Sequence, residues 1–337
     1  MAGAPVRTEV CITVDVEPSV GGAFDPAKGR EPLLHPLVAG TINGRSEALG
    51  FLIRTLQDTG LAATFFVETL HTSYFDEGEM GGYVEGLMSQ GHDPQLHVHP
   101  AWFSFRNGKA VASSRVSDHC ADHPVEQLVE FLEAGKRQFE RWTGRAPVAM
   151  RTGSFSTSRA AFQAMSRVGL KASSSICVGH SPPREPELQL PSGAHLIDGI
   201  WEYPITSFRD CGPVGRSRFR GLQVTACAQW EIRALLEDAN RNGYPYVIIV
   251  THPFEFIKKD GPRYAKLTAN RINQSRFRWL CAYLAKNPDR FPVVTMSELA
   301  QRPPLKLNRH VPELASAAIP SLLRSAQNVL NDHIWAL

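Results

Sequence analysis

The 337-residue sequence lacks the features that mark several large classes of protein. No uninterrupted apolar run approaches the ~20 residues that a membrane-spanning helix needs. No block of lysine and arginine residues occurs either, and 36 basic residues against 33 acidic ones leave a formal charge of only +3. We therefore expect no membrane span and no nucleic-acid partner.

The first residues show no export signal, and the cysteines show no pairing pattern. Residues 1–7 lack the apolar centre of a signal peptide, and residues 8–14 already have the composition of a core strand. The cysteines contain no C-x-x-C pair, which argues against a zinc knuckle and against a disulfide framework. The six are Cys11, Cys120, Cys177, Cys211, Cys227 and Cys281. We expect reduced, mostly buried thiols in a cytoplasmic protein.

What the sequence does contain is an alternation of short apolar segments with amphipathic, helix-like segments. We expect strands at residues 9–16, 62–67, 94–98, 148–151, 171–176, 201–205, 246–251 and 293–295. We expect helices at residues 45–58, 82–89, 125–142, 158–168, 229–240 and 274–286. Such alternation predicts a parallel sheet, and strands apolar on both faces favour its closure. The predicted fold is α/β, a distorted (β/α) barrel of seven or eight mostly parallel strands.

The barrel is expected to occupy residues 1–301, and residues 302–337 are expected to form a helical extension. The boundary lies at Arg302-Pro303-Pro304, and the apolar positions between Leu314 and Leu337 fit one face of a helix. We expect this helix to pack on the outside of the barrel, with a contact between two copies in a homodimer as the alternative. Irregular stretches at residues 18–44, 102–123, 179–199 and 208–221 should build the walls of the catalytic rim.

Two pairs of polar side chains close predicted strands. Asp15 and Glu17 share one face at the end of the first strand, and His97 and His99 share one face at the end of the third. Two imidazoles and one carboxylate form a ligand set of catalytic zinc sites. Either acid could instead cap the following loop, and either histidine could merely form a hydrogen bond.

Two further polar residues follow apolar strands in the same way. Arg151 ends the fourth predicted strand, and His252 directly follows the apolar run at residues 246–251. The carboxyl ends of parallel strands meet at one end of a barrel, where barrel enzymes assemble their active sites. The acidic pair, the histidine pair, Arg151 and His252 are therefore expected to converge.

The order of these segments resembles the polysaccharide deacetylase family, the NodB-homology domain of carbohydrate esterase family 4. The resemblance runs from about Thr8 to Ala300. A branch linked to surface-polysaccharide synthesis also looks similar, because its His-x-His-Pro motif precedes a tryptophan, here Trp102. The segments that carry it are Thr13-Val14-Asp15-Val16-Glu17, Ala63-Thr64-Phe65-Phe66-Val67, Gly91-His92-Asp93, Arg151-Thr152-Gly153 and Thr251-His252-Pro253.

The resemblance implies a metal-dependent hydrolase that removes an N-acyl group, most simply N-acetyl. Asp15 would be the general base, Arg151 would orient it, and His252 would be the general acid. A divalent metal, zinc by preference, would be bound by Glu17, His97 and His99. Many relatives have a second aspartate where Val16 stands and a second histidine where Ala101 stands, so Glu17 and His99 would replace them.

The expected substrate is a small-molecule or lipid-linked sugar carrying an acyl group. Trp201 and Val250 could wall a pocket for the acyl methyl, although both are equally well explained as barrel core. Two alternatives remain open. One is a metal-independent amide hydrolase that resembles the allantoinase-like branch of this fold, and the other is a barrel that binds sugar without catalysis.

Overall fold

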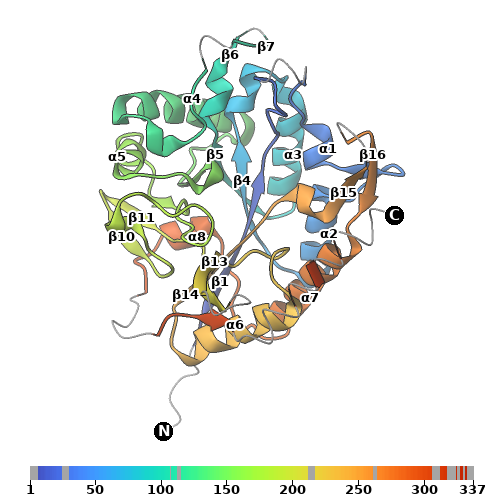
Figure 1. Ribbon diagram of the computed structural model, residues 1–337, viewed down its shortest axis with the longest axis vertical. Helices are drawn as coiled ribbons and strands as arrows, with labels where there is room; N and C mark the ends of the chain where they lie inside the picture. Colours follow the sequence, from blue (N-terminus) through green and yellow to red (C-terminus); the bar gives the residue numbers. More distant parts are fainter. Residues whose placement is uncertain are drawn as a thin grey trace.

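An eight-stranded, strongly curled sheet forms the centre of the computed structural model (Figure 1). The structure describes residues 7–24, 30–106, 108–111, 115–211, 217–260, 264–305 and 312–316, together with Arg324, Gln327, Asn328 and Asn331. In spatial order the strands are β10 (His195–Ile197), β11 (Ile200–Glu202), β9 (Ala172–Ser173), β8 (Ala149–Thr152), β5 (Asp93–Val98), β4 (Thr64–Glu68), β1 (Glu9–Val16) and β14 (Tyr246–Thr251). Every neighbouring pair is parallel except β10 and β11.

Backbone hydrogen bonds outside these strands connect the two sides of the curled sheet. The N–H of Ile205 donates to the carbonyl of Ile176 beyond β9 at 2.8 Å, and the next N–H, of Thr206, donates to Ile248 in β14 at 3.1 Å. One short segment therefore pairs with both sides of the sheet. The predicted α/β fold with a distorted, mostly parallel barrel is confirmed.

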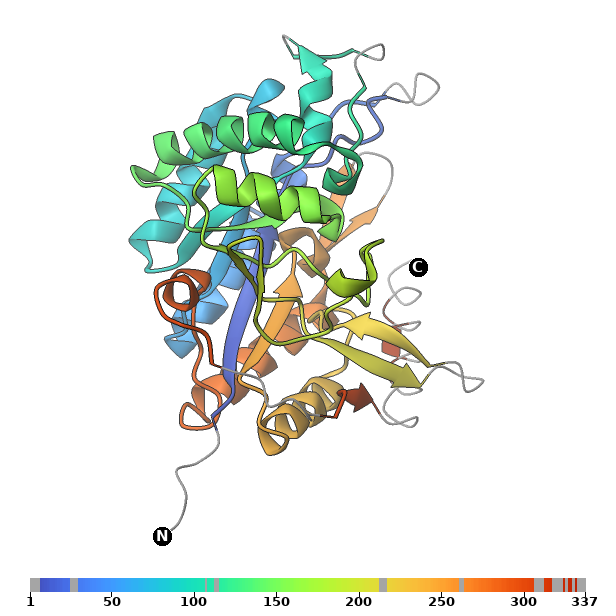
Figure 2. The ribbon, with the colours of Figure 1, turned by 90° about the vertical axis from the view of Figure 1, so that its left-hand side faces the viewer.

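Amphipathic helices surround the sheet, and α4 and α5 lie side by side on one outer side (Figure 2). The helices are α1 (His35–Val38), α2 (Leu49–Thr59), α3 (Glu77–Ser89), α4 (Val125–Thr143), α5 (Arg159–Arg167), α6 (Gln229–Arg241), α7 (Arg271–Ala285) and α8 (Met296–Ala300). Local chemistry sets their ends. Asp76 accepts a hydrogen bond from the N–H of Gly78 at the start of α3, and Gly144 ends α4 in the left-handed region at φ 69°.

The alternation of side chains along β1 separates the core from the barrel interior. Val10, Ile12, Val14 and Val16 are fully buried in the cluster that includes the apolar faces of α2, α6 and α7. The intervening positions point the other way, so Cys11 packs in a different cluster inside the barrel. The same alternation, continued to the end of the strand, directs Asp15 and Glu17 to the interior side.

Short antiparallel hairpins differ from the sequence-based expectation. Residues 208–221, expected to be irregular, form β12 (Ser207–Cys211) and β13 (Ser217–Gly221), which extend to one side of the barrel (yellow in Figure 2). The other hairpins are β2 (Thr41–Ile42) with β3 (Arg45–Ser46), β6 (Phe105–Arg106) with β7 (Lys109–Ala110), and β15 (Ile257–Asp260) with β16 (Lys266–Ala269). These strands are short or charged, so their sequences lack the alternation of apolar and polar residues from which a strand can be predicted. Conversely, the strand expected at residues 293–295 is only a bridge between Val293 and Val10.

The described part of the C-terminal segment contacts the barrel. β17 (Ala315–Ser316) pairs with β12, Leu314 is buried, and Arg324 forms ion pairs with Asp210 and Glu231. The expected helix falls largely outside the described residues, which leave out Ile319, Leu322, Leu323, Val329, Leu330 and Ile334. The helical extension, its boundary at residue 302 and the homodimer therefore stay predictions.

Two expectations about composition can be compared with the described residues. No helix among them is both long and apolar enough to cross a membrane. Five of the six cysteines are buried free thiols, as expected: Cys11, Cys120, Cys177, Cys227 and Cys281.

Candidate active site

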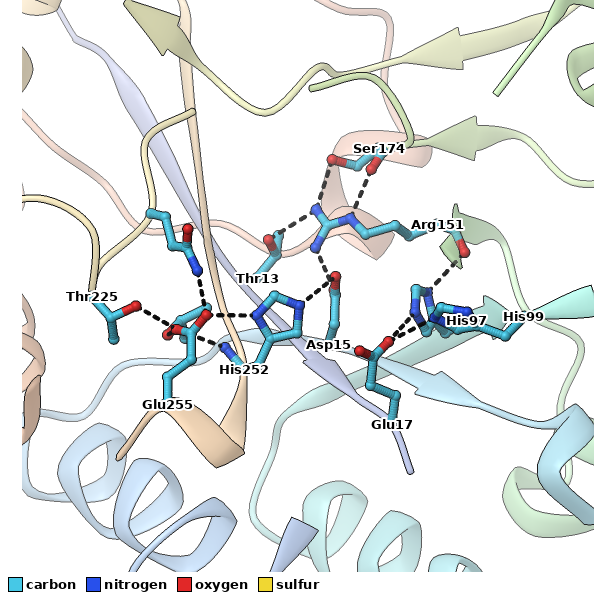
Figure 3. A network of polar contacts seen from close by, with 12 residues as sticks. Thr13, Asp15, Glu17, His97, His99, Arg151, Ser174, Thr225, His252 and Glu255 are labelled. Carbon is cyan, nitrogen blue, oxygen red and sulfur yellow. Dashed lines mark hydrogen bonds and ion pairs between the residues drawn. The ribbon is translucent and has the colours of Figure 1, made fainter. Parts of the chain in front are cut away.

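The predicted site residues meet where the parallel strands of the barrel end (Figure 3). The register of neighbouring strands aligns these residues across the sheet. His97 of β5 is the register partner of Arg151 in β8 and, on its other side, of Glu68 in β4. On the other side of β1, Val14 is the partner of Thr251, which directly precedes His252. The expected convergence is thus observed.

A buried ion pair joins β8 to β1. Nη1 of Arg151 donates to Oδ1 of Asp15 at 2.5 Å, and neither side chain is more than 3% exposed. Nη2 donates to the hydroxyls of Thr13 at 2.9 Å and Ser174 at 2.8 Å, while Nε donates to the carbonyl of Ser174 at 2.7 Å. The guanidinium also stacks over the ring of Phe66 at 4.3 Å. These contacts fix the predicted Asp15–Arg151 pair in one geometry.

His252 lies on the opposite side of Asp15 from Arg151. Its Nε2 is 3.6 Å from Oδ2 of Asp15, and its Nδ1 is 2.9 Å from Oε1 of Glu255. Glu255 is held by hydrogen bonds from Thr251 at 2.7 Å and Thr225 at 2.8 Å. Burial opposes a charge on the imidazole, but Glu255, Asp15 and Glu17 raise the pKa of His252 to about 9. His252 is therefore protonated at neutral pH and turned toward Asp15.

Glu17, His97 and His99 form a compact cluster of metal-ligand type. Their ligand atoms all lie within 4.8 Å of one another, and Oε2 of Glu17 is 2.8 Å from Nε2 of His97 and 2.9 Å from Nε2 of His99. The other ring nitrogens face acceptors, because Nδ1 of His97 is 2.9 Å from the carbonyl of Arg151 and Nδ1 of His99 is 2.8 Å from Oδ2 of Asp118. In a metal-bound form with Nδ1 protonated, both Nε2 lone pairs would be available to the ion beside the carboxylate, which is the arrangement of histidines that bind a metal. This donor set fits a divalent cation.

Electrostatics in this cluster follow its geometry. Burial opposes ionisation of Glu17, but the charge of His99 and hydrogen bonds from both imidazoles hold the pKa of Glu17 well below its ordinary value. Burial likewise opposes a charge on His99, and Asp118 and Glu17 raise the pKa of His99 well above its ordinary value. Two carboxylates facing one imidazole favour a positive charge between them, as a proton or as a metal ion.

A cavity of about 410 Å³ opens onto part of this site. Its walls include Asp15, Glu17, His252 and Val250. Trp201, the other residue expected in a pocket for the acyl methyl, is not among the residues that line this cavity. Trp201 pairs in register with Ala172, before the level of Arg151, and packs on the interior core cluster. The strand alternation of the sequence could not reveal at which height along the barrel the tryptophan would lie.

Two consecutive wall residues have strained backbone. Ser154 and Phe155, in the 3-10 turn η5 (Gly153–Phe155) directly after β8, have φ values of 55° and 51°. The left-handed region costs residues other than glycine about 1–3 kcal/mol each and is found preferentially at functional sites. The turn brings both residues to the cavity lining.

Sequence reasoning missed the residues that hold the predicted ones. Asp118 accepts from His99 and, at 3.2 Å, from the backbone N–H of Ala101. Glu255, three residues after His252, and Ser174, next to Arg151, were also not predicted. Of these three, only Glu255 could have been predicted from the local sequence, because it is an acidic residue in the turn that follows the strand-end histidine His252. Asp118 lies 19 positions from His99, so only the folded loop brings the two together.

Comparisons with known proteins bear on the fold. No protein-family model matches the chain, and no curated protein sequence matches it significantly. The chain is similar in structure to a candidate polysaccharide deacetylase from Mycobacterium smegmatis, with a TM-score of 0.55 and 16% identity over 93% of this chain and 97% of the other. The fold is that of the polysaccharide deacetylases.

Other solved structures of this fold are more distant. A family 4 carbohydrate esterase from Streptomyces lividans in complex with acetate gives a TM-score of 0.41 and 11% identity, covering 86% of this chain and 91% of that one. A family 4 pseudoenzyme from Bacillus anthracis gives 0.42 and 12%, covering 88% of this chain and 66% of that one. The likeness to the Mycobacterium smegmatis structure, at 16% identity, shows the fold alone, and the activity must be argued from the side chains.

The buried ion pair generates a prediction about stability. Arg151→Met leaves the Asp15 carboxylate buried without its cation. We expect the free energy of unfolding to fall by about 3–5 kcal/mol, measured by urea denaturation. Arg159→Met is the matched control, because Arg159 pairs with Asp198 at the surface with 55% of its side chain exposed, and it should change stability by less than about 1 kcal/mol. Equal losses in the two variants would contradict this reading.

Proposed function

We propose that this protein is a metal-dependent hydrolase that removes an N-acyl group, most simply N-acetyl, from a sugar or a sugar-containing precursor. The observation that carries the proposal is that a carboxylate, a protonated imidazole and Glu17 line one cavity, and that Glu17 also belongs to a three-ligand cluster with His97 and His99. Each of these groups is held from behind by another polar residue. A module that only binds sugar needs neither a base paired with an acid nor a cluster of metal-ligand type.

The chemistry follows from which atoms face the cavity. Asp15, oriented by Arg151, which donates in turn to Thr13, accepts a proton from the attacking water through Oδ2. His252 donates its Nε2 proton to the leaving nitrogen, which would otherwise depart as an unstable anion. A divalent metal, zinc by preference, held by Glu17, His97 and His99, would polarise the acyl carbonyl and lower the pKa of water. Glu255 keeps the donor imidazole charged and oriented.

The function is tested by acetate release from a panel of N-acetylated sugars, small and lipid-linked, by protein loaded with zinc. We expect turnover by the wild type and a loss of at least about 100-fold in Asp15→Asn, which keeps the side-chain shape and removes the base. Sugar binding without acetate release would favour the non-catalytic alternative. Turnover that survives complete removal of metal by a chelator would favour the metal-independent amide hydrolase.

Metal binding makes a separate prediction. His97→Ala and His99→Ala should each lower metal content, measured by elemental analysis, together with activity. Asp118→Asn should weaken metal affinity by about 10- to 100-fold, because it loosens the orientation of His99. His35→Ala is the control, since this exposed histidine bonds Glu79 and Thr41 away from the cluster. If His99→Ala kept full metal occupancy, the third ligand would have to be another residue, with Asp15 as the first to test.

The pH dependence follows from the sign of the His252 shift. A general acid works in its protonated form, so turnover should fall as pH rises through the pKa of His252, about 9. In Glu255→Gln the carboxylate that does most to raise this pKa is gone, and the alkaline limb of kcat should move to lower pH. Glu126→Gln, at an exposed position on α4, should leave the profile unchanged. An unmoved limb in Glu255→Gln would remove His252 from the role of acid.

A further inference from the structure

One cation in the wall of the catalytic cavity has no part in the proposed chemistry. Arg220, in β13, lines the same cavity as Asp15, Glu17 and His252. Its side chain is 24% exposed, and its Nε donates to Oδ2 of Asp210 at 3.1 Å. Across the described part of the chain, its two Nη groups make no hydrogen bond.

A buried ion network holds this arginine in place from behind. Arg324 donates to the same Oδ2 of Asp210 at 2.7 Å and also pairs with Glu231. Glu231 accepts a further hydrogen bond from Ser316 at 2.6 Å, and neither acid lines the cavity. Asp210, Glu231 and Arg324 are each at most 2% exposed. The Nε side of Arg220 is therefore fixed, which reduces the entropy lost when the Nη side binds a ligand.

Close backbone packing fixes the wall that carries Arg220. A Cβ atom added to Gly179 would lie 2.0 Å from the backbone nitrogen of Gly221 and 2.5 Å from Cα of Arg220. Only glycine permits this approach between the segment after β9 and the end of β13. The segment also places His180 in the cavity wall, where burial and the nearby charge of His252 lower the pKa of His180.

The charged residues around the cavity indicate which kind of substrate group Arg220 could bind. Asp15 is paired with Arg151, Glu255 with His252, and Glu17 with the two ligand histidines. Each acid that lines the cavity thus has a partner. The Nη edge of Arg220 is a planar pair of donors, which matches the two oxygens of a carboxylate or phosphate.

We propose that Arg220 forms an anion-binding subsite of the catalytic cavity, and that the substrate is an acylated sugar carrying a carboxylate or phosphate group near its N-acyl group. This inference rests on the proposed deacylation for the identity of the substrate, but the subsite itself can be tested by binding. Arg220 selects the substrate, while Asp15 and His252 act on the amide.

The test compares three probes that share an N-acetyl group: N-acetylglucosamine, N-acetylglucosamine 1-phosphate and the corresponding 2-acetamido uronic acid. We expect the wild type to have a higher kcat/KM for at least one anionic probe than for the neutral one. In Arg220→Met the ratio of anionic to neutral kcat/KM should fall on the order of 10- to 100-fold. The ratio is insensitive to partial unfolding, which lowers both rates together. The phosphate and carboxylate probes show which anion the subsite takes.

Arg218→Met is the matched control, because Arg218 is exposed on the same strand and does not line the cavity; it should keep the wild-type ratio. The same probes are titrated by calorimetry against Asp15→Asn, with and without Arg220→Met. Preferred binding of an anionic probe that depends on Arg220, without hydrolysis by the wild type, would support the subsite and overturn the reaction. Hydrolysis of all three probes at equal kcat/KM would support the reaction and overturn the subsite. Neither binding nor hydrolysis of any probe would overturn both.

Discussion

Arg151 joins the two halves of the candidate site through different parts of one residue. Its guanidinium holds Asp15, and its backbone carbonyl accepts the Nδ1 proton of His97. The side chain is completely buried, so its charge is stable only with the ion pair, the two hydroxyls and the carbonyl that surround it. Because of this arrangement the base and the metal-ligand cluster have a fixed relation to each other. The site depends on this residue more than on any other.

The same principle recurs around the cavity. His97 and His99 direct one ring nitrogen at Glu17, and His252 directs one at Asp15. The other ring nitrogen of each faces a protein acceptor, which is Arg151, Asp118 and Glu255 respectively. This second contact selects the tautomer and the orientation of the ring. The groups are therefore arranged before any ligand arrives, and binding energy need not be used to order them. Arg220, held through Asp210, follows the same design with a guanidinium in place of an imidazole.

The barrel makes this arrangement possible because one face of each strand packs against the helices and the other face points into the barrel interior. Along β1 one set of alternate residues packs against the helices, and the other set passes from the interior core to the acids of the site. The stability of the fold and the position of the reactive groups are thus properties of one strand. The strain at Ser154 and Phe155 lies directly beyond the buried end of β8, where the surrounding packing can maintain it.

Much of the fold and of the site could be read from the sequence. Parallel strands are apolar on both faces, so a polar residue at the end of such an apolar run must lie at the carboxyl end of the strand. This reasoning predicted the positions of Asp15, Glu17, His97, His99, Arg151 and His252. What the sequence did not determine were features that depend on distance through space. The hairpin of β12 and β13 has no apolar period, Asp118 and Ser174 meet their partners from other segments, and the height of Trp201 depends on strand register. Local patterns record which face a side chain takes, whereas tertiary packing decides which side chains meet.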